Sequence, residues 1–215
     1  MSGLVRRVPG LLWHAVVFEL AMYRNLLRWV SRRPSVGPGD EPVGYARLVT
    51  PVMCLLIFAS AAEVPLMHVL LPWRTAQIIS IVLGAWTLVW MLGLLAGLRT
   101  RPHLISDSGL RVRNGAFVDI PLPWAAMASV TTKEVDLPSS IKGLQPLVTE
   151  DGTDLRVGVS GQVNIQVRLR EPLAVPTRAG ELTVDRVSFW VDEPRQVATR
   201  IRERLVSRGT SGVTS

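Results

Sequence analysis

The chain has 215 residues, of which 48% are hydrophobic and 19% are charged, and its formal net charge is +7. This composition is too apolar for an ordinary soluble domain and too charged for a bundle made only of membrane helices. Cys54 is the single cysteine, so the sequence offers no disulfide within the chain. The positive charges flank apolar segments, which favours membrane topology and anionic lipids, and not nucleic acid, as their cause.

The first predicted element is a helix over residues 9–33, in an N-terminal region that spans residues 1–34. At about 100° per residue, one stripe of this helix is basic and includes Asn25, and the opposite stripe is apolar. This pattern predicts a helix in the lipid headgroup region; the alternative is a helix that packs on the protein's own spans or soluble domain. Glu19 lies in the apolar stripe and therefore needs a partner or a proton. The predicted membrane-surface residues are Arg24, Arg28, Arg32 and Arg33.

A turn-rich linker over residues 35–45 leads into a predicted transmembrane hairpin over residues 46–99. Its two apolar segments, at about residues 48–71 and 76–98, are each long enough to cross a hydrocarbon core of about 30 Å. Arginines gather before the first segment and after the second, whereas Arg74 stands alone in the short turn. The positive-inside rule therefore predicts that both termini are cytoplasmic.

Glu63 lies inside the first apolar segment, where a charged side chain costs a few kcal/mol. In a hairpin it is about as deep as Trp86 and Thr87, so the three residues form a candidate intramembrane polar site. One interpretation is a neutral glutamate bonded to Thr87 or Trp86. The alternatives are a pair with another subunit or a partner protein, and a proton or ion path in an oligomer.

From about residue 100 the hydrophobic period changes to two, with turn signals between short strands. We predict a cytoplasmic domain over residues 100–208 with about seven mostly antiparallel strands, closed by a C-terminal helix that starts near the N-cap candidate Asp192 and can end at Gly209. Residues 209–215 are predicted to be a disordered tail. The expected fold class is an α+β membrane protein whose β part is a barrel or sandwich.

Two stretches, "HLISDSGLRVRNGAFVDIPLPWAAMASV" (103–130) and "VSFWVDEPRQVATRIRERL" (187–205), resemble the bacterial pleckstrin-homology-like domains attached to membrane spans. The order of "YRNLLRWVSRRP", "LLPWR" and "RPHL--DSGLRVRNG" is similar to an actinobacterial two-span membrane protein family of undefined role. The resemblance implies a PH-like fold at the bacterial inner membrane, and it implies no activity.

No catalytic, cofactor or metal motif is visible, so we expect a non-enzymatic protein without a cofactor. Arg111 and Arg113 alternate with apolar residues, which indicates a solvated strand face first and a weak phosphate contact second. The leading hypothesis is a membrane-proximal module that binds protein or lipid, with a protein partner or a second copy and possible contact with anionic lipids. The alternatives are a subunit of an oligomeric transporter or channel that uses Glu63, and an accessory subunit of a membrane enzyme.

Overall fold

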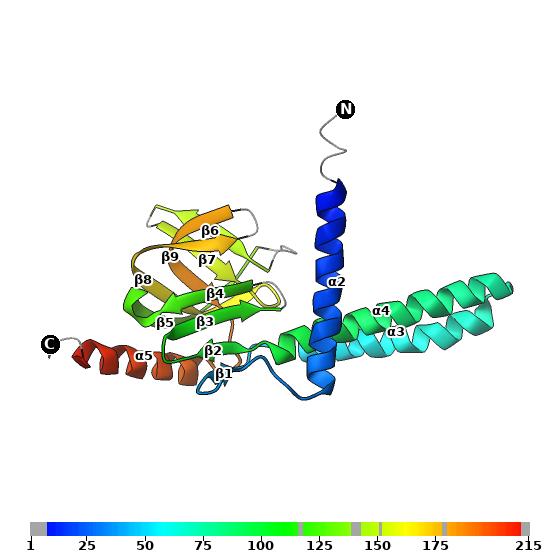
Figure 1. The fold of residues 1–215 in the computed structure, drawn as a ribbon, viewed down its shortest axis with the longest axis horizontal. Coiled ribbons are helices and arrows are strands. Elements are labelled where there is room, and N and C mark those ends of the chain that lie inside the picture. The colour runs from blue at the N-terminus through cyan, green and yellow to red at the C-terminus, as the bar shows by residue number, and fades with distance from the viewer. Residues whose placement is uncertain (1–7, 116–117, 139–142, 151, 178–179, 212–215) are drawn as a thin grey trace, which may run out of the picture. The chain divides into compact units, whose positions relative to one another are not determined.

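The computed structural model describes residues 8–115, 118–138, 143–150, 152–177 and 180–211, and these fall into two compact units. The helical unit takes residues 1–34 and 50–100, and the β unit takes residues 35–49 and 101–215 (Figure 1). The chain is therefore α+β, with two long apolar helices, two sheets and a C-terminal helix, as predicted. The predicted linker belongs to the β unit, because three of its residues form a strand.

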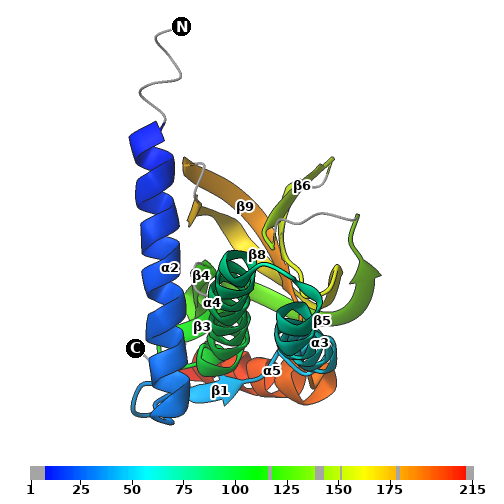
Figure 2. The same ribbon diagram turned by 90° about the vertical axis from the view of Figure 1, so that its right-hand side faces the viewer.

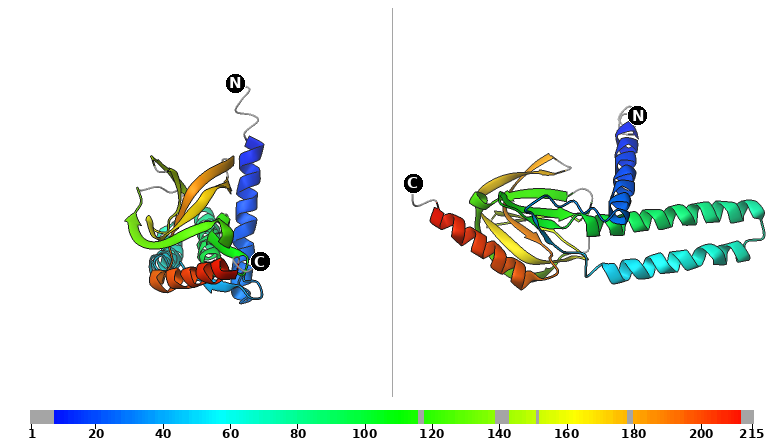
Figure 3. Two further views of the ribbon diagram at one scale, coloured as in Figure 1. Left: turned by 90° about the vertical axis from the view of Figure 1, so that its left-hand side faces the viewer. Right: turned by 60° about the horizontal axis from the view of Figure 1, so that its bottom comes forward.

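Two helices of the helical unit, α3 (Thr50–Leu70) and α4 (Arg74–Thr100), form an antiparallel hairpin (Figure 3). Their 21 and 27 residues correspond to about 32 and 40 Å, so both are long and apolar enough to cross a bilayer. The helices approach closely at Gly84, where a Cβ atom would lie 2.5 Å from Cγ2 of Val64. No residue of α3 is buried, so its apolar surface needs a cover outside this chain.

The remaining helix of this unit, α2 (Val8–Val30), lies against α4 and not against α3 (Figure 2). Met22 is buried beside Gly93, and Asn25 is buried beside Gly97, where a Cβ atom would lie 3.0 Å from Nδ2 of Asn25. Small residues on α4 thus admit α2 closely. The structure shows α2 packed on one of the two long apolar helices, as in the predicted alternative. Asn25 lies in that contact and not on a lipid-facing basic stripe.

The β unit contains two sheets with the strand orders β1-β2-β3-β4 and β5-β8-β9-β7-β6. All neighbouring strands are antiparallel except β7 and β9. The described residues form nine strands, where about seven were predicted, partly because the linker supplies a strand too short to show a period. The strands are β1 (Glu41–Val43), β2 (His103–Ile105), β3 (Gly109–Asn114), β4 (Val118–Pro123), β5 (Met127–Asp136), β6 (Gln145–Thr149), β7 (Gly152–Val157), β8 (Gln162–Thr177) and β9 (Gly180–Phe189).

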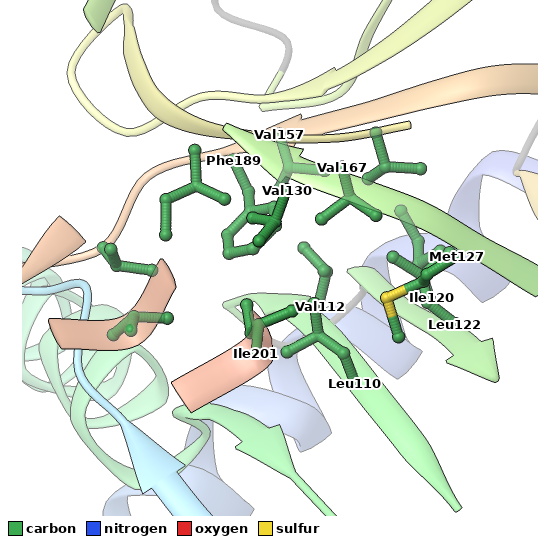
Figure 4. Packing of buried hydrophobic residues seen from close by; sticks show 14 of the residues in the cluster. Leu110, Val112, Ile120, Leu122, Met127, Val130, Val157, Val167, Phe189 and Ile201 are labelled. Atoms are coloured by element: carbon green, nitrogen blue, oxygen red, sulfur yellow. The ribbon is translucent and has the colours of Figure 1, made fainter. Parts of the chain in front are cut away.

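One hydrophobic core lies between the two sheets and the helix α5 (Pro194–Ser211). Figure 4 shows Val112 of β3 facing Phe189 of β9, with Ile201 of α5 beside them. Alternating residues supply this core in β3, with Leu110 and Val112, and in β8, with Ile165, Val167 and Leu169, as the period of two predicts. An ion pair between Glu41 and Arg200 joins β1 to α5.

The start and the end of α5 differ from the prediction. The Asp192 carboxylate accepts a hydrogen bond from the backbone N–H of Arg47 (3.0 Å), so it binds the segment after β1 instead of capping the helix. Burial raises the pKa of Asp192. The helix continues through residues 209–211, past the predicted stop at Gly209, and the rest of the predicted tail, residues 212–215, lies outside the described residues.

His103 is a fully buried polar residue in the β unit. Its Nδ1 accepts a hydrogen bond from the backbone N–H of Arg113 (2.9 Å), so the neutral ring carries its proton on Nε2 and donates to the carbonyl of Trp190 (2.9 Å). The ring contacts the rings of Tyr45 and Phe189. Desolvation by burial lowers the pKa of His103 from 6.5 to about 4. The neutral imidazole thus joins β2, β3 and the segment after β9.

We predict that the β unit loses stability as the pH falls from 6.5 towards about 4, the usual and the folded-state pKa values of His103. The unfolded chain binds a proton at His103 in this window and the folded chain does not, which costs up to about 3 kcal/mol at pH 4. The melting temperature of the full chain, measured from pH 4 to pH 7, should depend less on pH in His103→Gln than in the wild type. Equal pH dependence in both proteins would contradict this assignment.

Candidate functional site

A cleft of about 440 Å³ lies in the helical unit, where α2 and α4 both end. Arg28 is in the last turn of α2, Arg99 is in the last turn of α4, and both line the cleft with Arg32 and Trp29. We call this feature the arginine cleft. Its position follows from the sequence, because basic residues near helix C-termini interact favourably with the helix dipole.

The arginine cleft has no internal counter-charge in the described part of the chain. None of its three arginines lies within ion-pair distance of a carboxylate there. Three guanidinium groups around one cleft therefore present a positive site with many free N–H donors. Such groups bind phosphate and carboxylate oxygens, often with two parallel hydrogen bonds.

The four predicted membrane-surface arginines do not all lie in the same place in the structure. Arg28 and Arg32 line the arginine cleft, whereas Arg24 and Arg33 are exposed outside its lining. Arg99 was predicted only as a topology signal, and the structure places it in the cleft. A signal for the grouping was present in the sequence, because each of the two helices has an arginine in its last turn.

The predicted ligand contacts Arg111 and Arg113 lie in the β unit, away from the arginine cleft residues in the chain. With Arg101 they surround the carboxylate of Asp119, and we call these four residues the Asp119 cluster. The Asp119 carboxylate pairs with Arg111 at 2.8 Å, and with Arg101 and Arg113 at 3.4 Å each. Arg111 also donates through Nε to Oδ1 of Asp119 (3.0 Å), so this pair is bidentate. Three arginines thus share one carboxylate.

The Asp119 cluster corrects the prediction of a solvated strand face. The side chain of Arg113 is only 6% exposed, and its Nη1 donates to the carbonyl of Ser35 (2.8 Å). Arg111 is more exposed but is occupied by Asp119. Sequence reasoning missed Asp119, because its pairing with Arg113 depends on the register between β3 and β4. We therefore assign the cluster to structure and not to ligand binding.

The predicted intramembrane site of Glu63, Trp86 and Thr87 does not assemble as a bonded group. The indole Nε1 of Trp86 donates instead to Glu19 (2.9 Å), which also accepts from the Tyr23 hydroxyl (2.8 Å). Glu63 and Thr87 are exposed, and neither side chain has a hydrogen bond within the described part of the chain.

Two packing contacts explain this outcome. Val64, and not Glu63, faces α4 at Gly84, and neighbouring helix residues point about 100° apart. Glu63 is therefore turned away from α4. Meanwhile α2 covers the part of α4 that carries Trp86, and it brings Glu19 to that indole. Glu19 thus has the partners that its place in an apolar stripe required.

Among the described residues, no three His, Cys, Asp or Glu side chains gather as metal ligands would. Comparison with known proteins finds no matching family, no matching curated protein and no matching solved structure. Function is therefore inferred from the geometry of the arginine cleft, the Asp119 cluster and the intramembrane groups.

We predict that Asp119→Asn destabilises the β unit much more than Arg111→Gln does. The first change leaves three arginines without their shared carboxylate and should cost about 2 kcal/mol, less than for a fully buried pair because Asp119 is 25% exposed. The second removes the most exposed arginine and should cost under about 1 kcal/mol. Thermal unfolding of both variants at the same salt concentration measures the difference, and similar losses would contradict the shared-carboxylate account.

Proposed function

We propose that this chain is a non-enzymatic integral membrane protein that binds anionic phospholipid headgroups in the arginine cleft. The observation that carries the proposal is the convergence of Arg28, Arg32 and Arg99 without a carboxylate at the ends of two helices. Lipid phosphates supply the missing negative charge, and each basic residue near an anionic surface contributes about 1 kcal/mol.

The length of α4 supports this location of the cleft. Its 27 residues reach about 40 Å, more than a hydrocarbon core of about 30 Å, so its ends extend into the headgroup regions when it spans a bilayer. Arg99 is next to the last residue of α4 and would lie among the headgroups. Trp29 lines the same cleft, and tryptophan is enriched at this depth.

The β unit is proposed to be a PH-like domain held at the cytoplasmic face of a bacterial inner membrane. Its two sheets, shared core and C-terminal helix are compatible with that fold, and the resemblance of residues 103–130 and 187–205 supports it. Arg101 follows the last residue of α4 directly in the chain, so the domain would stay close to the bilayer. The arginines on either side of the two spans support the orientation.

The lipid-binding proposal predicts that Arg28→Gln weakens the affinity for phosphatidylglycerol about fivefold, the equivalent of about 1 kcal/mol. The full chain in neutral detergent micelles is titrated with this lipid, and binding is followed by the rise in melting temperature. Arg195→Gln is the matched control, because Arg195 is exposed on α5 and lies outside the cleft. Unchanged affinity in Arg28→Gln, or an equal loss in the control, would exclude the arginine cleft as the lipid site.

A second candidate function is a subunit of an oligomeric membrane assembly, and the exposure of Glu63 favours it. A carboxylate in an apolar helix usually faces protein, a cavity or a partner. Glu63 has no hydrogen-bond partner in the described part of this chain. A second copy or another membrane protein could provide the partner, as in a transporter or in a complex where this chain is an accessory subunit.

This second candidate predicts that Glu63→Gln reduces crosslinked oligomers or complexes in native membranes while leaving the melting temperature of the isolated chain unchanged. Glu63 makes no hydrogen bond within the described part of the chain, so its removal affects only contacts outside the chain. Thr87→Val is the control, since Thr87 is also exposed on a span. A lower melting temperature with unchanged crosslinking would instead show that Glu63 is structural.

A further inference from the structure

The pairing of β8 with β9 is interrupted in the middle. Arg168 pairs with Arg186, and the next pair is Leu173 with Val184. Residues 169–172 of β8 therefore lie opposite the single residue Asp185 of β9. Bulges of this kind re-aim side chains and occur often next to functional sites. The extra residues create a cavity of about 350 Å³, which we call the bulge cavity.

Three arginines and two acids line the bulge cavity. Arg168, Arg170 and Glu171 come from β8, and Asp185 and Arg186 come from β9. Arg168 and Arg186 are direct cross-strand partners, a position in which like charges destabilise a sheet. Within the described residues, no carboxylate lies within ion-pair distance of any of the three arginines.

The two acids do not neutralise the arginines, and one of them is already in use. Asp185 accepts a hydrogen bond from the backbone N–H of Thr153 at 2.7 Å. Arg170 donates through Nε to the carbonyl of Met127 (3.0 Å), which holds its side chain against β5. The lining residues together carry a formal charge of +1, because three arginines outnumber two carboxylates.

Unused donors remain on the two facing arginines. Arg186 donates through Nη2 to the Thr149 hydroxyl (2.9 Å), but its Nε is buried and has no hydrogen-bond partner in the described part of the chain. The guanidinium of Arg168 forms no hydrogen bond with any described residue. A buried donor without a partner is unfavourable, so an acceptor between these side chains would be stabilising.

We propose that the bulge cavity binds a small molecule through a phosphate ester, with Arg168 and Arg186 as its direct ligands. The negative charge of a phosphate ester offsets the positive charge of the lining, its oxygens accept from both guanidinium groups, and its presence relieves the cross-strand repulsion. The volume of the cavity is at the lower end for small-molecule sites and exceeds the needs of a bare ion. This site lies wholly in the β unit and does not depend on the arginine cleft.

The probes are glycerol 3-phosphate, a soluble phosphate monoester, and dihexanoyl phosphatidic acid below its micelle concentration, which presents the same phosphate monoester on a lipid. Each is titrated calorimetrically into the full chain in nanodiscs of neutral lipid at low salt. Both probes should bind the wild type if the phosphate ester alone is recognised. Tighter binding of glycerol 3-phosphate would indicate a soluble ligand, and tighter binding of the lipid probe would indicate a headgroup.

Arg168→Gln should weaken binding of the soluble probe at least about tenfold, because it removes charge-assisted hydrogen bonds to the phosphate. Arg186→Gln should weaken binding to a similar extent. Arg186 is more buried than Arg168, so if Arg186→Gln fails to fold, Arg168→Gln still tests the site. Arg195→Gln is the control and should bind glycerol 3-phosphate like the wild type, because Arg195 is exposed on α5 and lines neither the bulge cavity nor the arginine cleft.

Three results would overturn the proposal. The first is no binding of either probe to the wild type. The second is an equal loss of binding in Arg195→Gln, which would indicate non-specific attraction to a basic protein. The third is binding of a hexaglutamate peptide, dependent on Arg168, without binding of either phosphate ester, which would assign the cavity to an acidic protein partner.

Discussion

The uncovered apolar surface of α3 and α4 is the constraint on which the rest of the protein depends. Leu55 and Phe58 are 66% and 72% exposed, and no residue of α3 is buried. Apolar surface in water costs about 25 cal/mol per Å², so this hairpin is unfavourable as a soluble structure and favourable in a bilayer. In lipid, each polar group along such a hairpin would need a partner.

The two glutamates of the helical unit, Glu19 and Glu63, differ in how this need for a partner is met. Glu19 accepts two hydrogen bonds, from Tyr23 and from Trp86, and this requires α2 to lie against α4. Gly93 and Gly97 make the close contact possible. Glu63 has no equivalent neighbour in the described structure, because α3 presents Val64 to α4. Both carboxylates have apolar neighbours in the sequence, and what packs beside each one in the structure differs.

The arginines also differ in whether a carboxylate lies nearby. Those that have one hold the fold together, and those that have none in the described part of the chain are available to an anion from outside the chain. At Asp119 one acid is shared by three arginines, and the group joins β3, β4 and the start of the β unit. In the arginine cleft and the bulge cavity, the arginines have no ion-pair partner among the described residues. Both are therefore places where an anion from outside the chain would be stabilised.

The sequence by itself determined the two apolar helices, the change to a period of two near residue 100, and the helix at the C-terminus. These features depend on hydropathy and spacing along the chain, which are local properties. It also placed Arg28 and Arg32, two of the three arginines of the cleft, near a helix end. The short strand β1 was not predictable, because three residues show no period and pair only when β2 is in place.

Only the tertiary structure decided which side chains meet. Asn25 has the position of a surface residue on a helical wheel, yet it is buried because Gly97 of another helix admits it. Arg113 alternates as an exposed residue would, yet Ser35 and Asp119 enclose it. The bulge cavity exists because β8 has extra residues opposite Asp185, a mismatch defined only by strand register. Packing partners come from distant segments, and a local pattern in one segment carries no information about the other.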